Sequence, residues 1–208
     1  MKNIKEFKSG TDLDLYINSK KKKFIQSGTE GEVYKTKDNN IIKYMKESYR
    51  PKYLSESKDI IMSSDLQLDS FIFPDELFVI GDQIVGYTSN YFEGNILKFP
   101  NSRVDHEQEL NLDALIEARF KMIEDIKELT ELGYYLVELP HNILFNNKKL
   151  CAIDTLDYRK SNMSDLLQKN IHNLDYALAF ELCDHTEDNS ISLGDDFDTV
   201  IQKIKRRN

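Results

Sequence analysis

Two short apolar runs constrain this chain most, because one begins with an amide side chain and the other leads into a carboxylate. The first is Asn142-Ile143-Leu144, and the second is Leu150-Cys151-Ala152-Ile153, followed by Asp154. The polar residues between them predict a turn, so the two runs are expected to pair as a β-hairpin. A hairpin would place Asn142 and Asp154 at one end, where amide and carboxylate oxygens suit a single Mg²⁺. The pattern therefore indicates phosphate chemistry.

A second motif near the N-terminus is typical of a tight loop between two strands. It reads Gln26-Ser27-Gly28-Thr29-Glu30-Gly31-Glu32-Val33-Tyr34-Lys35, and Ile41-Ile42-Lys43 follows after a short polar turn. Gly28 and Gly31 lack a Cβ, so the backbone there could turn tightly and approach a phosphate. Two successive hairpins are predicted, which would place Lys43 beneath the loop. Taken alone, the motif is also compatible with an ordinary hairpin that carries an exposed lysine.

Together, the two motifs resemble the protein-kinase-like family, over about Phe24 to Asp157. The expected elements also follow the family's order: a glycine loop, a lysine strand, a helix, further strands, a long helix and the Asn–Asp hairpin. The resemblance implies an α+β, two-lobed protein-kinase-like fold, with residues 1–208 as a single domain. The small β-rich N-lobe would span about 1–92, and the reduced helical C-lobe about 95–208. ATP and Mg²⁺ are the implied cofactors.

The resemblance assigns the nucleotide to residues of the glycine loop and of the lysine strand. Gly28, Gly31 and Val33 would bind it, with Val33 against the adenine. The departure here is Gln26, which stands where the family has its first glycine. Lys43 would neutralise the α- and β-phosphates and is thereby a candidate catalytic residue.

A carboxylate from the next helix would hold Lys43 in place if the family pattern applies. The helix is predicted over residues 52–62, and Glu56 is its best-placed acidic residue. Asp59 is the competing candidate. A plain surface role for either carboxylate also remains open.

The catalytic loop is where the chain departs most from the family. The family places its catalytic Asp five positions before the metal-binding Asn, and Val137 stands there in this chain. Glu138 is the candidate base, because a loop shortened by one residue would bring its longer side chain near the same place. The alternative is a solvated Glu138 in a pseudokinase without a base. His141 is interpreted as structural, and Asp154 keeps its metal-binding role although Thr155-Leu156 replaces the family's Phe-Gly.

Further elements are predicted between the two motifs. Residues 76–80 and 83–88 predict a hairpin about Gly81-Asp82, and Tyr87 to Asn95 would connect the lobes. Apolar side chains recur at helical spacing from Leu112 to Leu132, which predicts a core helix. Gly133 is expected to end that helix.

Two helices are predicted after Asp157, over Asp165–Leu182 and Asp195–Lys205, with a polar stretch from Asp184 to Ser190 between them. They leave no room for a full eukaryotic activation segment and its helical substrate platform. The chain thus resembles a minimal, bacterial-style kinase.

Composition excludes several classes of protein. The 208 residues are enough to bury a core, and the formal net charge of −8 argues against general nucleic-acid binding. The basic clusters at 20–23 and 203–207 are therefore expected to be solvated. No apolar run is long enough for a membrane span, and the N-terminus lacks a hydrophobic signal core.

The cysteines also favour a cytoplasmic protein. Cys151 and Cys183 do not form a CxxC motif or a disulfide framework, and Cys151 is expected to be a small core residue. Action outside the cell, as an effector, would need a dedicated secretion machine that the sequence does not show.

Three function classes remain open at this stage. The first is an ATP- and Mg²⁺-dependent phosphotransferase, in the manner of a serine/threonine-protein kinase, for which a protein hydroxyl is the favoured acceptor. The second is a pseudokinase that acts as a nucleotide-binding interaction module. The third is a kinase-fold nucleotidyl transferase, because a fold does not fix a reaction. A protein substrate or binding partner is expected, and the oligomeric state stays open.

Overall fold

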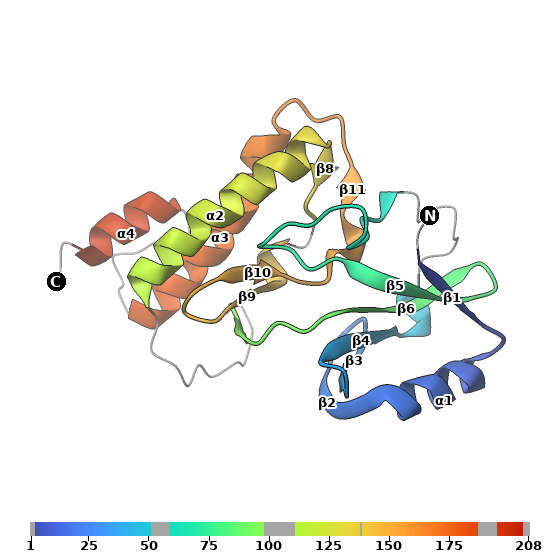
Figure 1. Cartoon of the computed structure of the whole chain (residues 1–208). Helices are drawn as coiled ribbons and strands as arrows, with labels where there is room; N and C mark the ends of the chain where they lie inside the picture. The colour runs from blue at the N-terminus through green and yellow to red at the C-terminus, as the bar shows by residue number, and fades with distance from the viewer. Residues whose placement is uncertain (1–2, 51–58, 98–110, 138, 187–194, 206–208) are drawn as a thin grey trace. The chain divides into compact units, whose positions relative to one another are not determined.

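The computed structural model describes residues 3–50, 59–97, 111–137, 139–186 and 195–205, and their fold is α+β (Figure 1). The chain divides into two compact units. Unit 1 comprises residues 1–67 and 72–92, and unit 2 comprises residues 68–71 and 93–208. Within the described ranges, unit 1 contains a six-stranded sheet and unit 2 contains three of the α-helices.

The sheet of unit 1 has the strand order β1-β5-β6-β4-β3-β2. Strand β1 runs parallel to β5, and every other neighbouring pair is antiparallel. The elements of unit 1 are β1 (Ile4–Phe7), α1 (Gly10–Lys20), β2 (Lys21–Ser27), β3 (Gly31–Thr36), β4 (Asn40–Met45), the 3₁₀ turn η1 (Glu47–Tyr49), β5 (Pro74–Ile80) and β6 (Gln83–Asn90).

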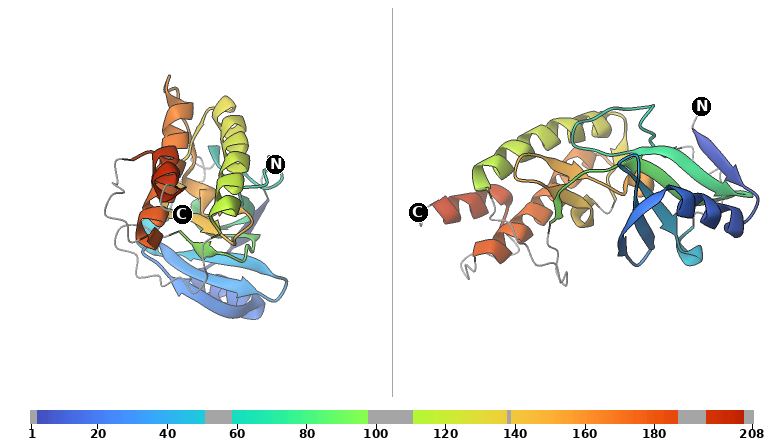
Figure 2. Two further views of the ribbon diagram at one scale, coloured as in Figure 1. Left: turned by 90° about the vertical axis from the view of Figure 1, so that its left-hand side faces the viewer. Right: turned by 60° about the horizontal axis from the view of Figure 1, so that its bottom comes forward.

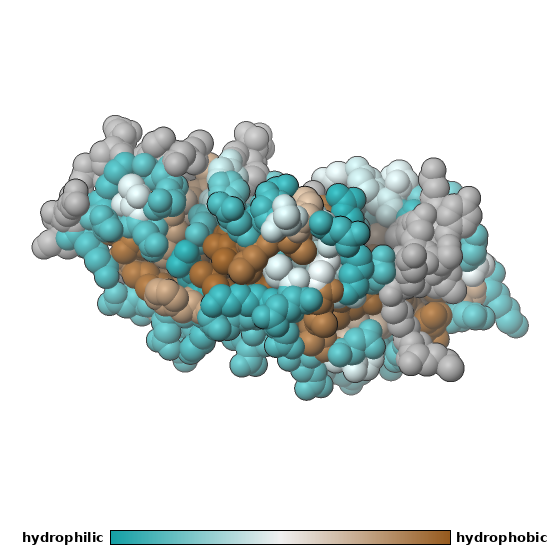
Figure 3. All heavy atoms as spheres, turned by 90° about the horizontal axis from the view of Figure 1, so that it is seen from above, coloured by the Kyte–Doolittle hydropathy of each residue, from teal (hydrophilic) through white to brown (hydrophobic). Residues whose placement is uncertain are grey.

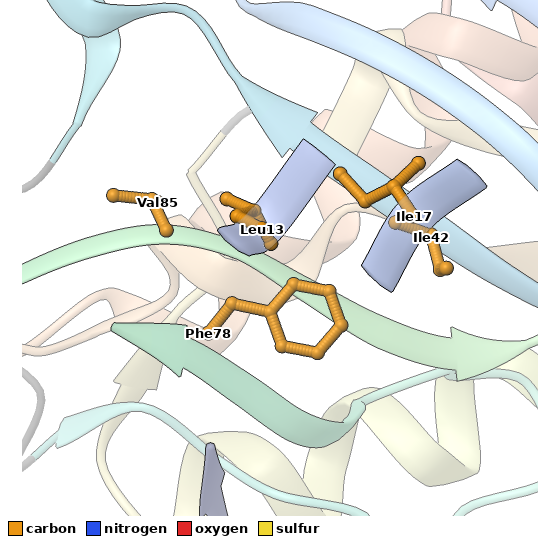
Figure 4. Packing of buried hydrophobic residues seen from close by; sticks show 5 residues of the cluster. All are labelled: Leu13, Ile17, Ile42, Phe78 and Val85. Atoms are coloured by element: carbon orange, nitrogen blue, oxygen red, sulfur yellow. The ribbon is translucent and has the colours of Figure 1, made fainter. Parts of the chain in front are cut away.

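Helix α1 covers part of this sheet and was not predicted from the sequence. Its N-cap is Ser9, whose hydroxyl accepts a hydrogen bond from the backbone N–H of Asp12. Leu13 and Ile17, one turn apart, are buried in a cluster formed by the residues labelled in Figure 4. The sheet contributes Ile42, Phe78 and Val85 to that cluster.

The predicted hairpins of unit 1 are confirmed. Strands β2, β3 and β4 pair in succession, and the turn before β4 has Asn39 in the left-handed region, at φ 63°. The β5–β6 hairpin turns at Gly81-Asp82, as expected from that dipeptide. Lysines 20–23 are exposed, in agreement with the prediction that they are solvated.

Two boundaries predicted in this unit are wrong. Residues 60–62 are not helical, because the backbone there enters a turn in which the Asp65 carboxylate accepts a hydrogen bond from the N–H of Met62. The preceding residues 51–58, which include Glu56, lie outside the described part of the chain. Residues 87–90 belong to strand β6 and not to a connection, because they continue its pairing with β4.

Unit 2 consists of helices together with short strands. Strands β7, β9 and β10 form one small sheet, in the order β10-β9-β7, and β8 pairs with β11. The elements are β7 (Asn95–Ile96), α2 (Leu112–Glu131), β8 (Tyr134–Tyr135), η3 (Leu139–His141), β9 (Ile143–Phe145), β10 (Leu150–Ala152), η4 (Thr155–Asp157), β11 (Arg159–Lys160), α3 (Leu166–Thr186) and α4 (Phe197–Lys205).

Helices α2 and α3 lie side by side, as both views in Figure 2 show. Arg119 on α2 joins them, because its Nε and Nη2 donate to the two carboxylate oxygens of Asp175 on α3 at 2.7 and 2.8 Å. The same guanidinium lies 4.6 Å from the ring centre of Phe197 on α4. This largely buried residue of α2 therefore contacts both α3 and α4.

The helices predicted for this unit are confirmed, with small shifts of their ends. Helix α2 ends before Gly133, whose φ of +80° is the left-handed conformation that favours glycine at a helix C-terminus. Helix α3 continues to Thr186, so Asp184 is helical and not part of a polar linker. Helix α4 begins at Phe197, where the carboxylate of Asp196 accepts a hydrogen bond from the N–H of Thr199.

Some large hydrophobic side chains remain exposed among the described residues. Figure 3 shows one face, on which hydrophobic residues lie among a majority of hydrophilic ones. Phe24 on β2 and Phe120 on α2 are among the large hydrophobic residues that remain exposed. In the described ranges, no helix combines the length and the apolar character that a membrane span requires.

Candidate functional site

Lys43 lies in the middle of β4, directly opposite Val33 on β3. Residues paired in this way project from the same face of a sheet, so the two side chains assigned to nucleotide share a face. Lys43 is only 7% exposed, and its Nζ donates a hydrogen bond to Oε2 of Glu30 at 2.8 Å. This carboxylate was not predicted; Glu56, the predicted partner, lies outside the described residues.

Lys46, the residue directly after β4, holds the loop that carries Glu30. The backbone N–H of Lys46 donates to the carbonyl of Glu30 at 2.8 Å, and its Nζ donates to the carbonyl of Gly28 at 2.7 Å. Across the loop, the N–H of Gly28 donates to the carbonyl of Gly31 at 2.9 Å. The backbone of Gly28–Gly31 is thus closed by hydrogen bonds that do not involve the Glu30 side chain.

The two glycines of the loop meet different surroundings. A Cβ at Gly31 would lie 2.2 Å from the carbonyl oxygen of Tyr44 on the adjacent strand, so no side chain fits there. A Cβ at Gly28 would have only the Gly31 carbonyl oxygen nearby, at 4.0 Å. Close packing against β4 therefore explains why residue 31 is a glycine, whereas the space at Gly28 would admit a side chain.

The second group of candidate residues lies on the β9–β10 hairpin, which is confirmed. Ile143 pairs with Ala152 and Phe145 with Leu150, and the N–H of Ile153 then donates to the carbonyl of Asn142 at 2.9 Å. This bond closes the open end of the hairpin, and Asp154 is the next residue. Asn142 and Asp154 are therefore attached at the same end of one hairpin, as predicted.

Asp154 has an unusual backbone conformation. Its φ of 57° and ψ of 47° lie in the left-handed region, which costs energy for a residue with a side chain. Asn39 and Asn147 also have positive φ, but both lie in hairpin turns, where this conformation is common. Asp154 instead lies between β10 and η4. Strained residues outside turns often belong to functional sites.

The hairpin is anchored to α2 through the segment 68–71. The N–H of Ala152 donates to the carbonyl of Ser70 at 2.8 Å, and the N–H of Ser70 donates to the carboxylate of Asp125 on α2 at 2.7 Å. Thr155, directly after Asp154, is fully buried. The backbone on both sides of Asp154 is therefore fixed by packing or by hydrogen bonds.

The segment that leads to the predicted catalytic loop is held by Asn170 on α3, which sequence reasoning missed. This asparagine is completely buried. Its Oδ1 accepts from the N–H of Leu136 at 3.0 Å, and its Nδ2 donates to the carbonyl of Tyr134 at 2.9 Å and to Oγ1 of Thr130 at 3.0 Å. A polar residue at a buried position of a predicted helix was the signal that could have identified it.

The chain on both sides of the predicted base is held by burial and by a backbone hydrogen bond. Leu136 and Leu139 are fully buried on either side of Val137 and Glu138, and the N–H of Leu139 donates to the carbonyl of Leu136 at 3.4 Å. Glu138 itself lies outside the described residues. His141 is an exposed residue at the end of η3.

Two buried side chains close to Asp154 in the sequence, Cys151 and Tyr158, are not candidate metal ligands. Cys151 is buried in β10, as predicted, and burial raises the pKa of its thiol to about 12. Burial also raises the pKa of Tyr158 well above its ordinary value, and the negative charge of Asp154 contributes in the same direction. Within the described part of the chain, the Tyr158 hydroxyl has no hydrogen-bond partner.

The donor set suits Mg²⁺ better than a metal that needs a complete protein cage. Among the described residues, no group of three or more histidine, cysteine, aspartate or glutamate side chains could hold a metal. Mg²⁺ usually binds one or two protein oxygens together with water and substrate phosphates, so the amide of Asn142 and the carboxylate of Asp154 fit it.

Comparison of the sequence with protein-family models and with curated proteins found no match.

Proposed function

We propose that this chain is an ATP- and Mg²⁺-dependent phosphotransferase of the protein-kinase-like fold, with a protein hydroxyl as acceptor. The observation that carries the proposal is the β9–β10 hairpin, which holds Asn142 and Asp154 at one end, with Asp154 in a left-handed conformation. Residues that carry an amide and a carboxylate at one end of a hairpin are the kinds of ligand that a phosphate-bound Mg²⁺ takes from a protein. The buried Lys43 in unit 1 is the second support.

Each candidate residue has a role in the proposed reaction. Lys43 would bind the α- and β-phosphates, Gly28 and Gly31 would allow the loop to approach them, and Val33 would contact the adenine. Asn142 and Asp154 would hold Mg²⁺, which when bound supplies charge neutralisation on the phosphates.

Glu138 is the proposed general base. It would accept the proton of the acceptor hydroxyl, so that the oxygen can attack the γ-phosphorus while the bond to the β-phosphate oxygen breaks. The acceptor leaves as a phosphate ester and the nucleotide leaves as ADP. Lys43 and the glycine loop belong to unit 1, whereas Glu138 belongs to unit 2.

The presence of Val137 where the family has its catalytic Asp favours a second candidate, a pseudokinase that binds nucleotide without transferring phosphate. A nucleotidyl transferase of the same fold is the third. ATP labelled at the α- or at the γ-phosphate separates these functions. Transfer of the γ label to protein supports the kinase, and transfer of the α label supports the nucleotidyl transferase.

Thermal unfolding tests nucleotide binding separately from transfer. ATP with Mg²⁺ at about a hundred times its Kd should stabilise the fold by about 2.7 kcal/mol, because the ligand binds only the folded chain. For a chain of this size that is a rise in Tm of roughly 5–10 °C. Asp154→Asn should remove the part of the rise that depends on Mg²⁺. Asp157→Asn, which removes an exposed carboxylate close by in the sequence, is the matched control.

Removing the proposed base should lower the transfer of phosphate without changing the binding of ATP. Glu138→Gln should keep the ATP-induced rise in Tm and lower transfer of the γ label by about 10²-fold, which is typical of a positioned general base. Unchanged transfer in Glu138→Gln would remove that residue from the mechanism. If ATP at millimolar concentration gives no rise in Tm with or without Mg²⁺, the proposed function is wrong.

A further inference from the structure

The carboxylate that binds Lys43 belongs to Glu30, in the glycine loop. An anion at this position would compete with nucleotide phosphates for the lysine ammonium. Glu30 Oε2 lies 2.8 Å from Lys43 Nζ, and the lysine side chain is 8% exposed while that of the glutamate is 37% exposed. An ammonium has three donor directions, and the Glu30 carboxylate takes one of them. A phosphate oxygen bound to the same ammonium would lie within a few ångströms of this carboxylate, and the two negative charges would repel each other.

The Glu30 side chain can leave Lys43 without disturbing the loop. The backbone of the loop is held by Lys46, which donates to the carbonyls of Gly28 and Glu30, and by the bond between Gly28 and Gly31. None of these bonds uses the Glu30 carboxylate. Because this side chain is partly exposed, rotation about its own bonds would return the carboxylate to water at small cost.

We propose that Glu30 is an internal counter-anion of Lys43 and that its carboxylate must be displaced before a nucleotide phosphate binds there. Glu30 is thus a determinant of affinity for polyphosphates. Its carboxylate lowers that affinity. In the absence of ligand, it keeps a nearly buried ammonium neutralised. This inference rests on the proposed function, because it names what the nucleotide has to replace in the same site.

Removal of the Glu30 charge should therefore strengthen binding. Glu30→Gln keeps the length and shape of the side chain and removes its charge. Isothermal titration calorimetry should show that this variant binds inorganic tripolyphosphate, and ATP with Mg²⁺, on the order of tenfold more tightly than the wild type, because the ligand no longer has to break the ion pair between Lys43 and Glu30. Its affinity for uncharged adenosine should not change.

The chain offers a matched control in Glu32→Gln. Glu32 lies two positions further along the chain, and its carboxylate accepts a hydrogen bond from the hydroxyl of Tyr34 and not from Lys43. The substitution changes the net charge by the same amount, so it reports any general electrostatic effect. It should leave both affinities within about twofold of the wild type.

A double-mutant cycle shows whether Glu30 acts through Lys43. If it does, Glu30→Gln should give no gain in affinity in a Lys43→Met background. A gain of equal size in that background, or in Glu32→Gln, would overturn the proposal, because the effect would then not depend on the pair.

The two ligands separate the failure of this proposal from that of the proposed function. If the wild type binds ATP with Mg²⁺ and Glu30→Gln binds both ligands equally or more weakly, Glu30 is not displaced and only this proposal is overturned. If Glu30→Gln binds tripolyphosphate more tightly through Lys43 but no variant binds ATP, the counter-anion is supported and the proposed function fails. If neither ligand binds any variant, both are overturned.

Discussion

Asn170 provides the strongest test of how the chain holds its predicted catalytic loop. Its side chain is fully buried and makes three hydrogen bonds, to the Leu136 N–H, the Tyr134 carbonyl and the Thr130 hydroxyl. Asn170→Ala removes all three. At about 1 kcal/mol net for each bond, the free energy of unfolding should fall by about 3 kcal/mol, and the buried N–H of Leu136, left without an acceptor, makes this a lower estimate.

The measurement is urea denaturation followed by circular dichroism at 222 nm, which reports chiefly on the helices of unit 2. The control is Asn173→Ala on the same helix. Asn173 contacts the same loop residue, but only through a 3.5 Å bond from its Nδ2 to the Leu136 carbonyl. That variant should lose less than about 1 kcal/mol. Equal losses in the two variants, or a loss below about 1 kcal/mol in Asn170→Ala, would refute the argument that burial makes these bonds important.

Two further predictions concern residues already described. Gly31→Ala should lower the free energy of unfolding by at least about 2 kcal/mol, because its Cβ would lie 2.2 Å from the Tyr44 carbonyl oxygen. Gly28→Ala should leave the free energy of unfolding nearly unchanged, and similar urea midpoints for the two variants would contradict this prediction. Cys151, with a thiol pKa of about 12, should react with iodoacetamide at pH 8 at least ~10³-fold more slowly in the folded chain than in urea. Peptide mass spectrometry measures the modification of Cys151, and rapid labelling of the folded chain would show that the thiol is not buried.

The hairpins and the long helices could be predicted because their signals are local. Asn39 and Gly81 lie in turns with positive φ, and such residues mark a reversal of the chain whatever surrounds it. Helix α2 places its apolar residues on one face over five turns and ends at a glycine with φ of +80°. The relation between Asn142 and Asp154 followed from the same kind of signal, a turn between two apolar strands.

The features that were missed depend on contacts between distant residues. Strand β1 exists because Ile4–Phe7 pair with a strand more than seventy positions away, which no short window reveals. Helix α1 has few apolar residues, and only the Ser9 cap and the pair of Leu13 and Ile17 mark it. The partnership of Glu30 with Lys43 could not have been inferred from the β3–β4 register, because Val33 is the residue opposite Lys43 and Glu30 lies in the loop before β3; the family resemblance directed attention to Glu56.

The parallel pairing of β1 with β5 has a consequence for the order in which unit 1 assembles. The β2-β3-β4 and β5-β6 segments are joined by tight turns and can form within microseconds. Strand β1 can dock only after β5 has been synthesised, and closing that long loop costs entropy before any contact repays it. Until β1 docks, the outer edge of β5 has unpaired backbone groups, so a truncated chain that lacks β1 should be more prone to associate through that edge.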